Sequence, residues 1–208
     1  MLVIVDYGVG NTFSIQSSLT HLGIASRVSN EASEVAAADQ LILPGVGAFG
    51  DAKAMLDNSG LVPLILEKVE YGTPLLGICL GMQLLFEESE EFGQHQGLGL
   101  IKGKIRSLKD RFQMESIEYK VPHIGWNTLQ QYRASPITKY LTNDPFVYYV
   151  HSYYATACED SLVADSPYGI AIPGIVQHRH VYGTQFHPEK SGETGLKILK
   201  AFAEVEKG

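Results

Sequence analysis

Short strand-like runs, several of them wholly apolar, alternate with helix-like segments through the first 90 residues, and this alternation limits the possible folds most strongly. An apolar run without polar alternation indicates a strand buried on both faces, as in parallel sheets. The sequence predicts strands at residues 2–5, 24–28, 40–43 and 73–78. It predicts helices at 12–22, 49–58, 61–70 and 80–88, and a polar, alanine-rich connection and helix within 30–39. Strand–helix–strand order favours parallel strands in an α/β domain.

The second half of the chain is predicted to contain hairpins. Glycine, proline and asparagine separate strand-like runs at 102–108, 126–129, 146–152, 169–173, 175–178 and 180–186, and a final helix covers 192–205. The whole chain, residues 1–208, is therefore expected to form a single α/β domain with a mixed, mostly parallel central sheet flanked by helices. Functional loops are expected at the carboxyl ends of the parallel strands.

Charge and composition exclude several classes of function. The net charge of −7 gives no electrostatic footprint for nucleic acid. No apolar run approaches the ~20 residues that span a bilayer, and the N-terminus has neither the basic start nor the cleavage site of a signal peptide. Two cysteines are too few for a disulfide framework, so reduced thiols and a cytoplasmic location are expected.

Cys79 lies in the segment Gly77-Ile-Cys79-Leu-Gly81, which has the G-x-C-x-G spacing of a nucleophile elbow. A sharp turn from strand to helix forces small residues two positions either side of the nucleophile. The start of the following helix lowers a thiol pKa and offers backbone N–H groups to an oxyanion. The alternative is a buried, inert cysteine whose neighbouring glycines only allow close packing.

A thiol nucleophile needs a base, and His187 is the histidine best placed to supply one. It lies in His187-Pro-Glu189, directly after a predicted strand, so that in an extended segment both side chains would point the same way. A base and its orienting carboxylate need that arrangement. His178 and His180 are predicted to occupy alternate positions of one strand, with no metal site because no further ligands cluster near them.

Seven segments together resemble the class I, triad-type glutamine amidotransferases, and within them the glutaminase subunits of imidazole glycerol phosphate synthases. They are DYGVGN (6–11), LPGVGAF (43–49), GICLGMQ (77–83), SEE (89–91), PHIGWN (122–127), VHSY (150–153) and QFHPEKS (185–191). The resemblance implies a Cys79-His187-Glu189 triad that hydrolyses the side-chain amide of glutamine. It also implies a (β/α)₈-barrel cyclase partner, forming a heterodimer, that uses the ammonia to convert PRFAR into imidazole glycerol phosphate and AICAR in histidine biosynthesis.

The same resemblance assigns roles to further residues, and it implies no cofactor and no metal. The oxyanion hole is expected from Gly45, Val46, Gly47 and Leu80, in a loop that needs rearrangement, so weak activity is expected without the partner. Substrate contacts are expected from Gln83, Glu91, His151, Ser152 and Tyr153, and partner contacts from Asn11, Trp126 and Lys190. The residues alone leave plainer alternatives open: an exposed amide at Gln83, helix-end solvation at Glu91, a core tryptophan and a surface lysine.

Three other functions are open at this point. The chain could be the glutaminase subunit of another ammonia-using synthase, such as pyridoxal phosphate or anthranilate synthase, although the PHIGWN and PGVGAF segments argue against both. It could be a stand-alone cysteine hydrolase. A scaffold without activity is disfavoured by the intact Cys79, His187 and Glu189.

Overall fold

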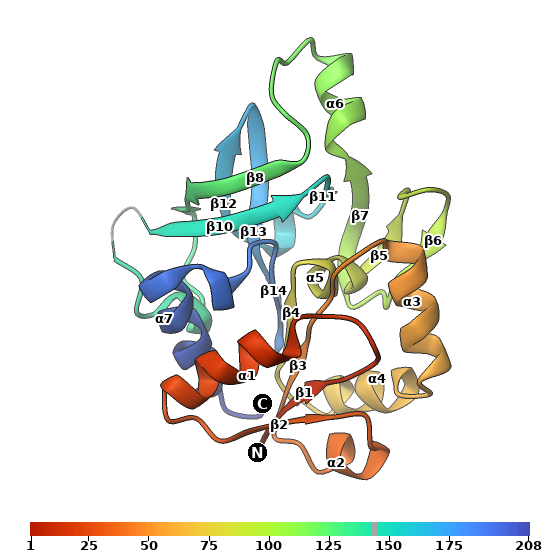
Figure 1. Ribbon diagram of the computed structural model, residues 1–208, viewed down its shortest axis with the longest axis vertical. Coiled ribbons are helices and arrows are strands. Elements are labelled where there is room, and N and C mark those ends of the chain that lie inside the picture. The colour runs from red at the N-terminus through yellow and green to blue at the C-terminus, as the bar shows by residue number, and fades with distance from the viewer. Residues whose placement is uncertain (143–144) are drawn as a thin grey trace.

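The computed structural model describes residues 1–142 and 145–208, and an eight-stranded sheet lies at its centre (Figure 1). The strand order is β2-β1-β3-β4-β14-β13-β12-β9. The strands from β2 to β14 pair in parallel and the others antiparallel, which confirms the mixed sheet. The strand bounds are β1 Leu2–Val5, β2 Ser26–Ser29, β3 Gln40–Leu43, β4 Leu75–Ile78, β9 Gln130–Gln131, β12 Leu162–Tyr168, β13 Ile170–His178 and β14 Val181–Thr184.

Helices cover both faces of the parallel strands (Figure 1). Consecutive residues of one strand enter different cores: Leu2 and Ile4 share a buried cluster with α1 and α7, whereas Val3 and Val5 share the other with α2, α3 and α4. This two-sided burial explains the uninterrupted apolar run in β1. The helices are α1 Thr12–His21, α2 Ala32–Ala36, α3 Phe49–Asn58, α4 Val62–Glu70 and α7 Gly192–Ala203. Across the described ranges, no helix is long and apolar enough to cross a membrane.

Two smaller sheets accompany the central one. One is two-stranded, β10-β8, and lies above α7 in Figure 1; the other has the order β11-β7-β5-β6. Only Ser152 separates β10 from β11, so the chain moves from one small sheet to the other within a single residue. The bounds are β5 Phe86–Ser89, β6 His95–Gln96, β7 Ile101–Ser107, β8 His123–Thr128, β10 Phe146–His151, β11 Tyr153–Thr156, α5 Leu80–Leu84 and α6 Leu108–Met114.

The predicted helix at 80–88 is wrong in its second half. Helix α5 stops at Leu84, and residues Phe86–Ser89 form β5 between β6 and β7. The backbone of Gly97 lies so close to β5 that a Cβ at this position would be 2.0 Å from the Phe86 carbonyl oxygen. The Gly97 N–H also donates to the Glu87 carbonyl at 2.8 Å. Pairing with distant strands therefore overrides a local pattern that favours a helix.

The antiparallel half also departs from prediction. The strands predicted at 169–173 and 175–178 are one strand, β13. Its neighbour β12 was not predicted, and it contains Pro167, a residue that is unfavourable within a sheet. His178 ends β13, but His180 lies in the turn to β14, beside Arg179 with φ of 51°. The two histidines therefore do not alternate along one strand.

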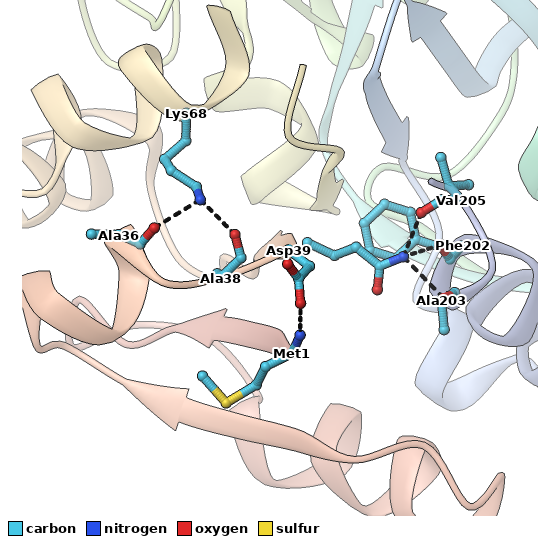
Figure 2. A network of polar contacts seen from close by, with 9 residues as sticks. Met1, Ala36, Ala38, Asp39, Lys68, Phe202, Ala203 and Val205 are labelled. Atoms are coloured by element: carbon cyan, nitrogen blue, oxygen red, sulfur yellow. Dashed lines mark hydrogen bonds and ion pairs between the residues drawn. The ribbon is translucent and has the colours of Figure 1, made fainter. Parts of the chain in front are cut away.

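A polar network ties both ends of the chain to the start of β3, an inner strand of the central sheet (Figure 2). The side-chain amide of Gln40, at the start of β3, donates to the carbonyls of Phe202, Ala203 and Val205 at 3.2, 3.0 and 2.7 Å. The amino group of Met1 pairs with Asp39. The Gln40 amide thus binds two carbonyls in the last turn of α7 and one just beyond its end.

Candidate active site

Cys79 stands at a sharp turn between β4 and α5, as the glycine spacing predicts. Its backbone has φ of 55° and ψ of −112°, a strained conformation for a residue with a side chain. Its N–H donates to the Thr184 carbonyl of β14 at 2.7 Å. A Cβ at Gly77 would lie 2.6 Å from the Gly81 carbonyl oxygen, and one at Gly81 would lie 1.9 Å from the Leu43 carbonyl oxygen. The elbow therefore requires both glycines.

His187 follows β14 and is bonded to Glu189. Its Nδ1 lies 2.8 Å from Glu189 Oε1, and the two side chains are 3% and 1% exposed. His187 itself is extended, but Pro188–Lys190 form a 3₁₀ turn, so the predicted extended segment is wrong after His187. The turn still brings the carboxylate onto the imidazole. The second carboxylate oxygen, Oε2, is buried without a hydrogen-bond partner among the described residues, so His187 is the partner that compensates this charge.

The imidazole of His187 is held in its protonated form. Burial works against the charged ring, yet the nearby Cys79 sulfur and the hydrogen-bonded Glu189 carboxylate raise the pKa of His187 to about 10. Because a sulfur and a carboxylate flank the ring, the proton on His187 is stabilised from both sides. This pairing of thiol, imidazole and carboxylate is the arrangement that activates a sulfur nucleophile.

A cavity of about 310 Å³ opens over the thiol and gathers most of the predicted site residues. Glu189 lies behind His187, and Gly45 lies behind the cavity wall, where its Cα packs so closely that a Cβ would lie 2.6 Å from the Gly81 nitrogen. Pro122 and Val150 also line the cavity and were not predicted, although both lie inside the motifs of the sequence analysis. The lining residues are Val46, Gly47, Cys79, Leu80, Gln83, Glu91, Pro122, Val150, His151, Ser152, Tyr153 and His187.

Gln83 is buried at 4% exposure rather than being an exposed amide. Its Nε2 donates to the Tyr153 carbonyl at 3.1 Å and to Gln185 Oε1 at 3.0 Å. The Gln185 Nε2 in turn approaches Cys79 Sγ at 3.9 Å. Gln185 was missed as a site residue, although it opens the QFHPEKS segment. Gln83 thus braces the cavity wall from within the protein.

Glu91 joins the cavity to the loop before α3. Its Oε2 accepts the Phe49 N–H at 2.7 Å, which supplies a cap that Ala48, at the start of α3, cannot provide. Burial raises the pKa of Glu91, and the Phe49 hydrogen bond opposes that effect. In the adjoining loop, Gly47 has φ of 93° and the Val46 side chain is 43% exposed. The oxyanion role of this loop stays a prediction.

The predicted partner residues lie outside the cavity. Asn11 caps α1 by accepting the Ser14 N–H at 3.3 Å, and Lys190 is an exposed residue of the turn after Glu189. Trp126 is 56% exposed, so it is not a core residue. Two other large apolar side chains are exposed near these residues: Ile124, on the same strand as Trp126, and Phe13, two positions after Asn11. Among residues 1–142 and 145–208, no three His, Cys, Asp or Glu side chains are grouped to hold a metal ion.

Comparisons with known proteins identify the family of the chain. The glutamine amidotransferase class-I family model matches residues 3–205. The HisH subunit of imidazole glycerol phosphate synthase from Listeria monocytogenes serotype 4a is 49% identical over 205 residues, covering 99% of this chain and 96% of the relative. The HisH subunit from Bacillus cereus strain G9842 is 47% identical, with coverage of 99% and 95%.

Solved structures share the fold at low sequence identity. A glutamine amidotransferase matches with a TM-score of 0.74 at 18% identity, covering 98% of this chain and 99% of the other. PurLQS from Thermotoga maritima matches with a TM-score of 0.74 at 19% identity, covering 97% and 96%. The chain belongs to the class-I glutamine amidotransferase family and, within it, to the HisH subunits of imidazole glycerol phosphate synthase.

Proposed function

We propose that the chain hydrolyses the side-chain amide of glutamine and passes the ammonia to a (β/α)₈-barrel cyclase subunit in histidine biosynthesis. One observation carries the proposal: a strained cysteine at a helix start shares a cavity of about 310 Å³ with a histidine whose Nδ1 is 2.8 Å from a buried carboxylate. The membership of the full chain in the HisH family selects the synthase. A cytoplasmic location follows from that biosynthetic role.

The sulfur of Cys79 attacks the carboxamide carbon of glutamine, forming a C–S bond and a tetrahedral oxyanion. His187, protonated at neutral pH, gives its proton to the leaving nitrogen, and ammonia departs as the C–N bond breaks. Neutral His187 then takes a proton from water, and the resulting hydroxide attacks the thioester. The C–S bond breaks, glutamate leaves and gives its carboxylic acid proton to solvent, and the Cys79 thiolate again faces protonated His187. Glu189 accepts from Nδ1 throughout, which fixes the ring orientation and stabilises the imidazolium.

Two backbone elements at the cavity are suited to the oxyanion. The N–H of Leu80 follows the nucleophile directly at the start of α5, and the Val46–Gly47 segment lines the opposite wall. Gly45 allows this segment to pack against α5 because its Cα lies too close to the Gly81 nitrogen for a side chain. Glycine adopts positive and negative φ about equally readily, so the backbone can rotate at Gly47, where φ is 93°. Partner docking that reorients this loop would therefore raise the glutaminase rate.

The amino-acid end of glutamine fits the far wall of the cavity. The Glu91 carboxylate lines it and offers a counter-charge to the substrate ammonium, and the backbone of residues 151–153 faces the carboxylate side. Gln83 holds this backbone from behind through the Tyr153 carbonyl. The size of the cavity, about 310 Å³, suits a single amino acid rather than a folded peptide segment.

The partner consumes ammonia that would be protonated and unreactive in free solution. The cyclase joins it to PRFAR and releases imidazole glycerol phosphate and AICAR. Asn11, Trp126 and Lys190 are the residues of this chain proposed to contact the barrel. Trp126 is the strongest candidate for an anchor, since an exposed tryptophan loses a large apolar area to a partner on docking.

Isotope transfer tests the proposal. The assembled chain and cyclase would receive PRFAR and glutamine labelled with ¹⁵N at the side-chain amide, together with an excess of unlabelled ammonium. The proposal predicts that the imidazole product carries the label undiluted by the ammonium, because the ammonia never reaches solvent. A product that takes its nitrogen from the added ammonium would contradict direct transfer, and glutamine that stays intact would contradict the glutaminase itself.

A further inference from the structure

Two imidazoles meet beneath the wall of the cavity. His123 of β8 and His151 of β10 are paired in register across the two-stranded sheet, and their side chains are buried. The His123 Nδ1 lies 3.0 Å from the His151 Nε2. Only His151 lines the cavity; the ring of His123 lies one layer further from the thiol. The hydrolysis described above gives His123 no task.

Aromatic rings hold His123 in place. Its ring stacks on Tyr149 with a centroid distance of 4.6 Å and on Tyr168 with a distance of 3.8 Å, at interplanar angles of 21° and 19°. Burial lowers the pKa of His123 to about 4. Burial also lowers the pKa of His151, and the neighbouring His123 lowers it further. Both rings are therefore neutral at pH 7 and cannot rotate freely.

The hydrogen-bond partners determine which nitrogens carry protons. The His151 Nδ1 lies 2.8 Å from the Tyr153 carbonyl oxygen, which can only accept, so Nδ1 is protonated. In a neutral ring the Nε2 of His151 then has a lone pair and must accept. The nitrogen facing it, His123 Nδ1, consequently carries a proton and donates. The two rings share one direction of donation, from His123 through His151 to the carbonyl.

The Tyr153 carbonyl holds the part of the cavity wall where the chain passes from β10 in one small sheet to β11 in the other. Tyr153 O accepts from His151 and from Gln83 Nε2, at 2.8 and 3.1 Å. The His151 bond spans Ser152, the single residue between β10 and β11, and the Ser152 carbonyl accepts the Leu108 N–H at 2.9 Å. The backbone of 151–153 is thus fixed by two side-chain donors and by the Leu108 N–H, and the same three residues line the cavity.

The geometry points to His123 as a positioning residue: by donating to His151 it orients the ring that holds the Tyr153 carbonyl, and so sets the wall that binds the amino-acid end of glutamine. This role rests on the proposed function for the identity of the ligand. It predicts an effect mainly on glutamine binding, because His123 acts directly on the wall. Its hydrogen bonds reach the Cys79 sulfur only through Gln83 and Gln185, which lie beyond the Tyr153 carbonyl.

Two variants separate the donor from the ring. His123→Phe keeps an aromatic ring between the tyrosines but removes the donor, whereas His123→Asn places an amide nitrogen near the Nδ1 position and removes the ring. His123→Phe should raise the KM for glutamine about 10-fold, with kcat changed less than about 2-fold. His123→Asn should restore most of the binding. The alkylation rate of Cys79 by iodoacetamide should be the same in both variants and the wild type.

Several results would overturn the role. They are an unchanged KM in His123→Phe, a loss confined to kcat, or a KM in His123→Asn at least as high as in His123→Phe. If His123→Phe does not fold, the comparison of His123→Asn with the wild type still decides, because a retained donor predicts a KM near the wild-type value.

A spectroscopic measurement is independent of glutaminase activity. Long-range ¹H–¹⁵N spectra of the chain labelled with ¹⁵N-histidine should show His123 and His151 as neutral rings protonated at Nδ1 at pH 7.5. An Nε2-protonated or a doubly protonated His151 would overturn the hydrogen-bond direction. Because this result needs no glutamine, it fails or succeeds separately from the proposed function, which fails if the wild-type chain and its partner release no glutamate.

Discussion

Acid should destabilise this protein through its buried histidine pair. His123 and His151 are 2% and 6% exposed, and burial is the main cause that lowers their pKa values from 6.5 to about 4 and about 3. Between pH 6 and pH 4 both histidines become protonated in the unfolded chain but stay largely neutral in the folded chain. The free energy of unfolding therefore falls as the pH falls. At pH 5 the pH is about 1.5 units below the pKa of 6.5 that each histidine has in the unfolded chain. Keeping each ring neutral in the folded state therefore lowers the free energy of unfolding by about 2 kcal/mol.

The pair therefore removes about 4 kcal/mol of stability between pH 7.5 and pH 5, a large part of the ~5–15 kcal/mol of a typical domain. His187 opposes this loss. Its pKa is raised from 6.5 to about 10 on folding, so the stability that it contributes is complete below about pH 6 and falls as the pH rises toward 10. It is therefore about 1 kcal/mol larger at pH 5 than at pH 7.5, equally in the wild type and in a His123 variant. The raised pKa values of Glu91 and Asp165 oppose the loss equally in the wild type and in a histidine variant.

Urea unfolding at pH 7.5 and pH 5, extrapolated to water, measures this loss. Compared with the wild type, His123→Phe removes one of the two titrating rings and should lose about 2 kcal/mol less over the same interval. His21→Gln, a change at an exposed histidine, should keep the wild-type loss and serves as the control. Equal losses in the wild type and His123→Phe would refute the reasoning, because His123 would then not be a buried neutral ring.

Three further predictions follow from the site and its supports. Glu189→Gln keeps an acceptor for His187 but removes the charge that stabilises the imidazolium, so kcat/KM for glutamine should fall about 10²- to 10⁴-fold in steady-state assays; a fall below about 2-fold would contradict the triad. Gly81→Ala would place a Cβ 1.9 Å from the Leu43 carbonyl oxygen, so urea unfolding should show a loss of at least about 3 kcal/mol; a wild-type midpoint would show that the elbow can relax. Trp126→Ala should weaken binding of the cyclase by about 2 kcal/mol in calorimetric titration without changing the unfolding temperature, and an unchanged Kd would remove Trp126 from the interface.

Much of the fold could be predicted because its signals are local. The apolar run Leu2–Val5 predicts a strand buried on both faces, as the structure has it. The helices α1, α3 and α4 begin and end within about one residue of their predicted bounds. The elbow around Cys79 was equally readable, since only glycine fits two residues away on either side.

The failures have non-local causes. Residues Phe86–Ser89 have a local helix pattern, but β6 and β7 offer them strand partners far away in the sequence. The segment of β12 contains Pro167, which is locally unfavourable in a strand. Its pairing with β13 makes it one in the folded protein. The contact of His187 with Glu189 was predicted for a reason that proved wrong: a 3₁₀ turn, and not an extended segment, brings the side chains together.

Some site residues could not have been found without the structure. Gln185 and His123 lie in motifs, yet nothing local shows that one approaches the Cys79 sulfur and the other the ring of His151. Those contacts depend on the order of strands in two different sheets. Chemistry-bearing side chains that act through a second residue are thus harder to identify from sequence than those that act at the cavity.

The release of glutamate from glutamine by the purified chain tests the central claim most directly. It would be measured alone, with the barrel cyclase, and with the cyclase and PRFAR, beside the variant Cys79→Ala. We expect slow release by the chain alone, strong stimulation by the liganded partner, and a rate in Cys79→Ala below about one-thousandth of the wild type. Release that persists in Cys79→Ala, or that stays absent with the liganded partner, would contradict the assignment of a partner-activated cysteine glutaminase.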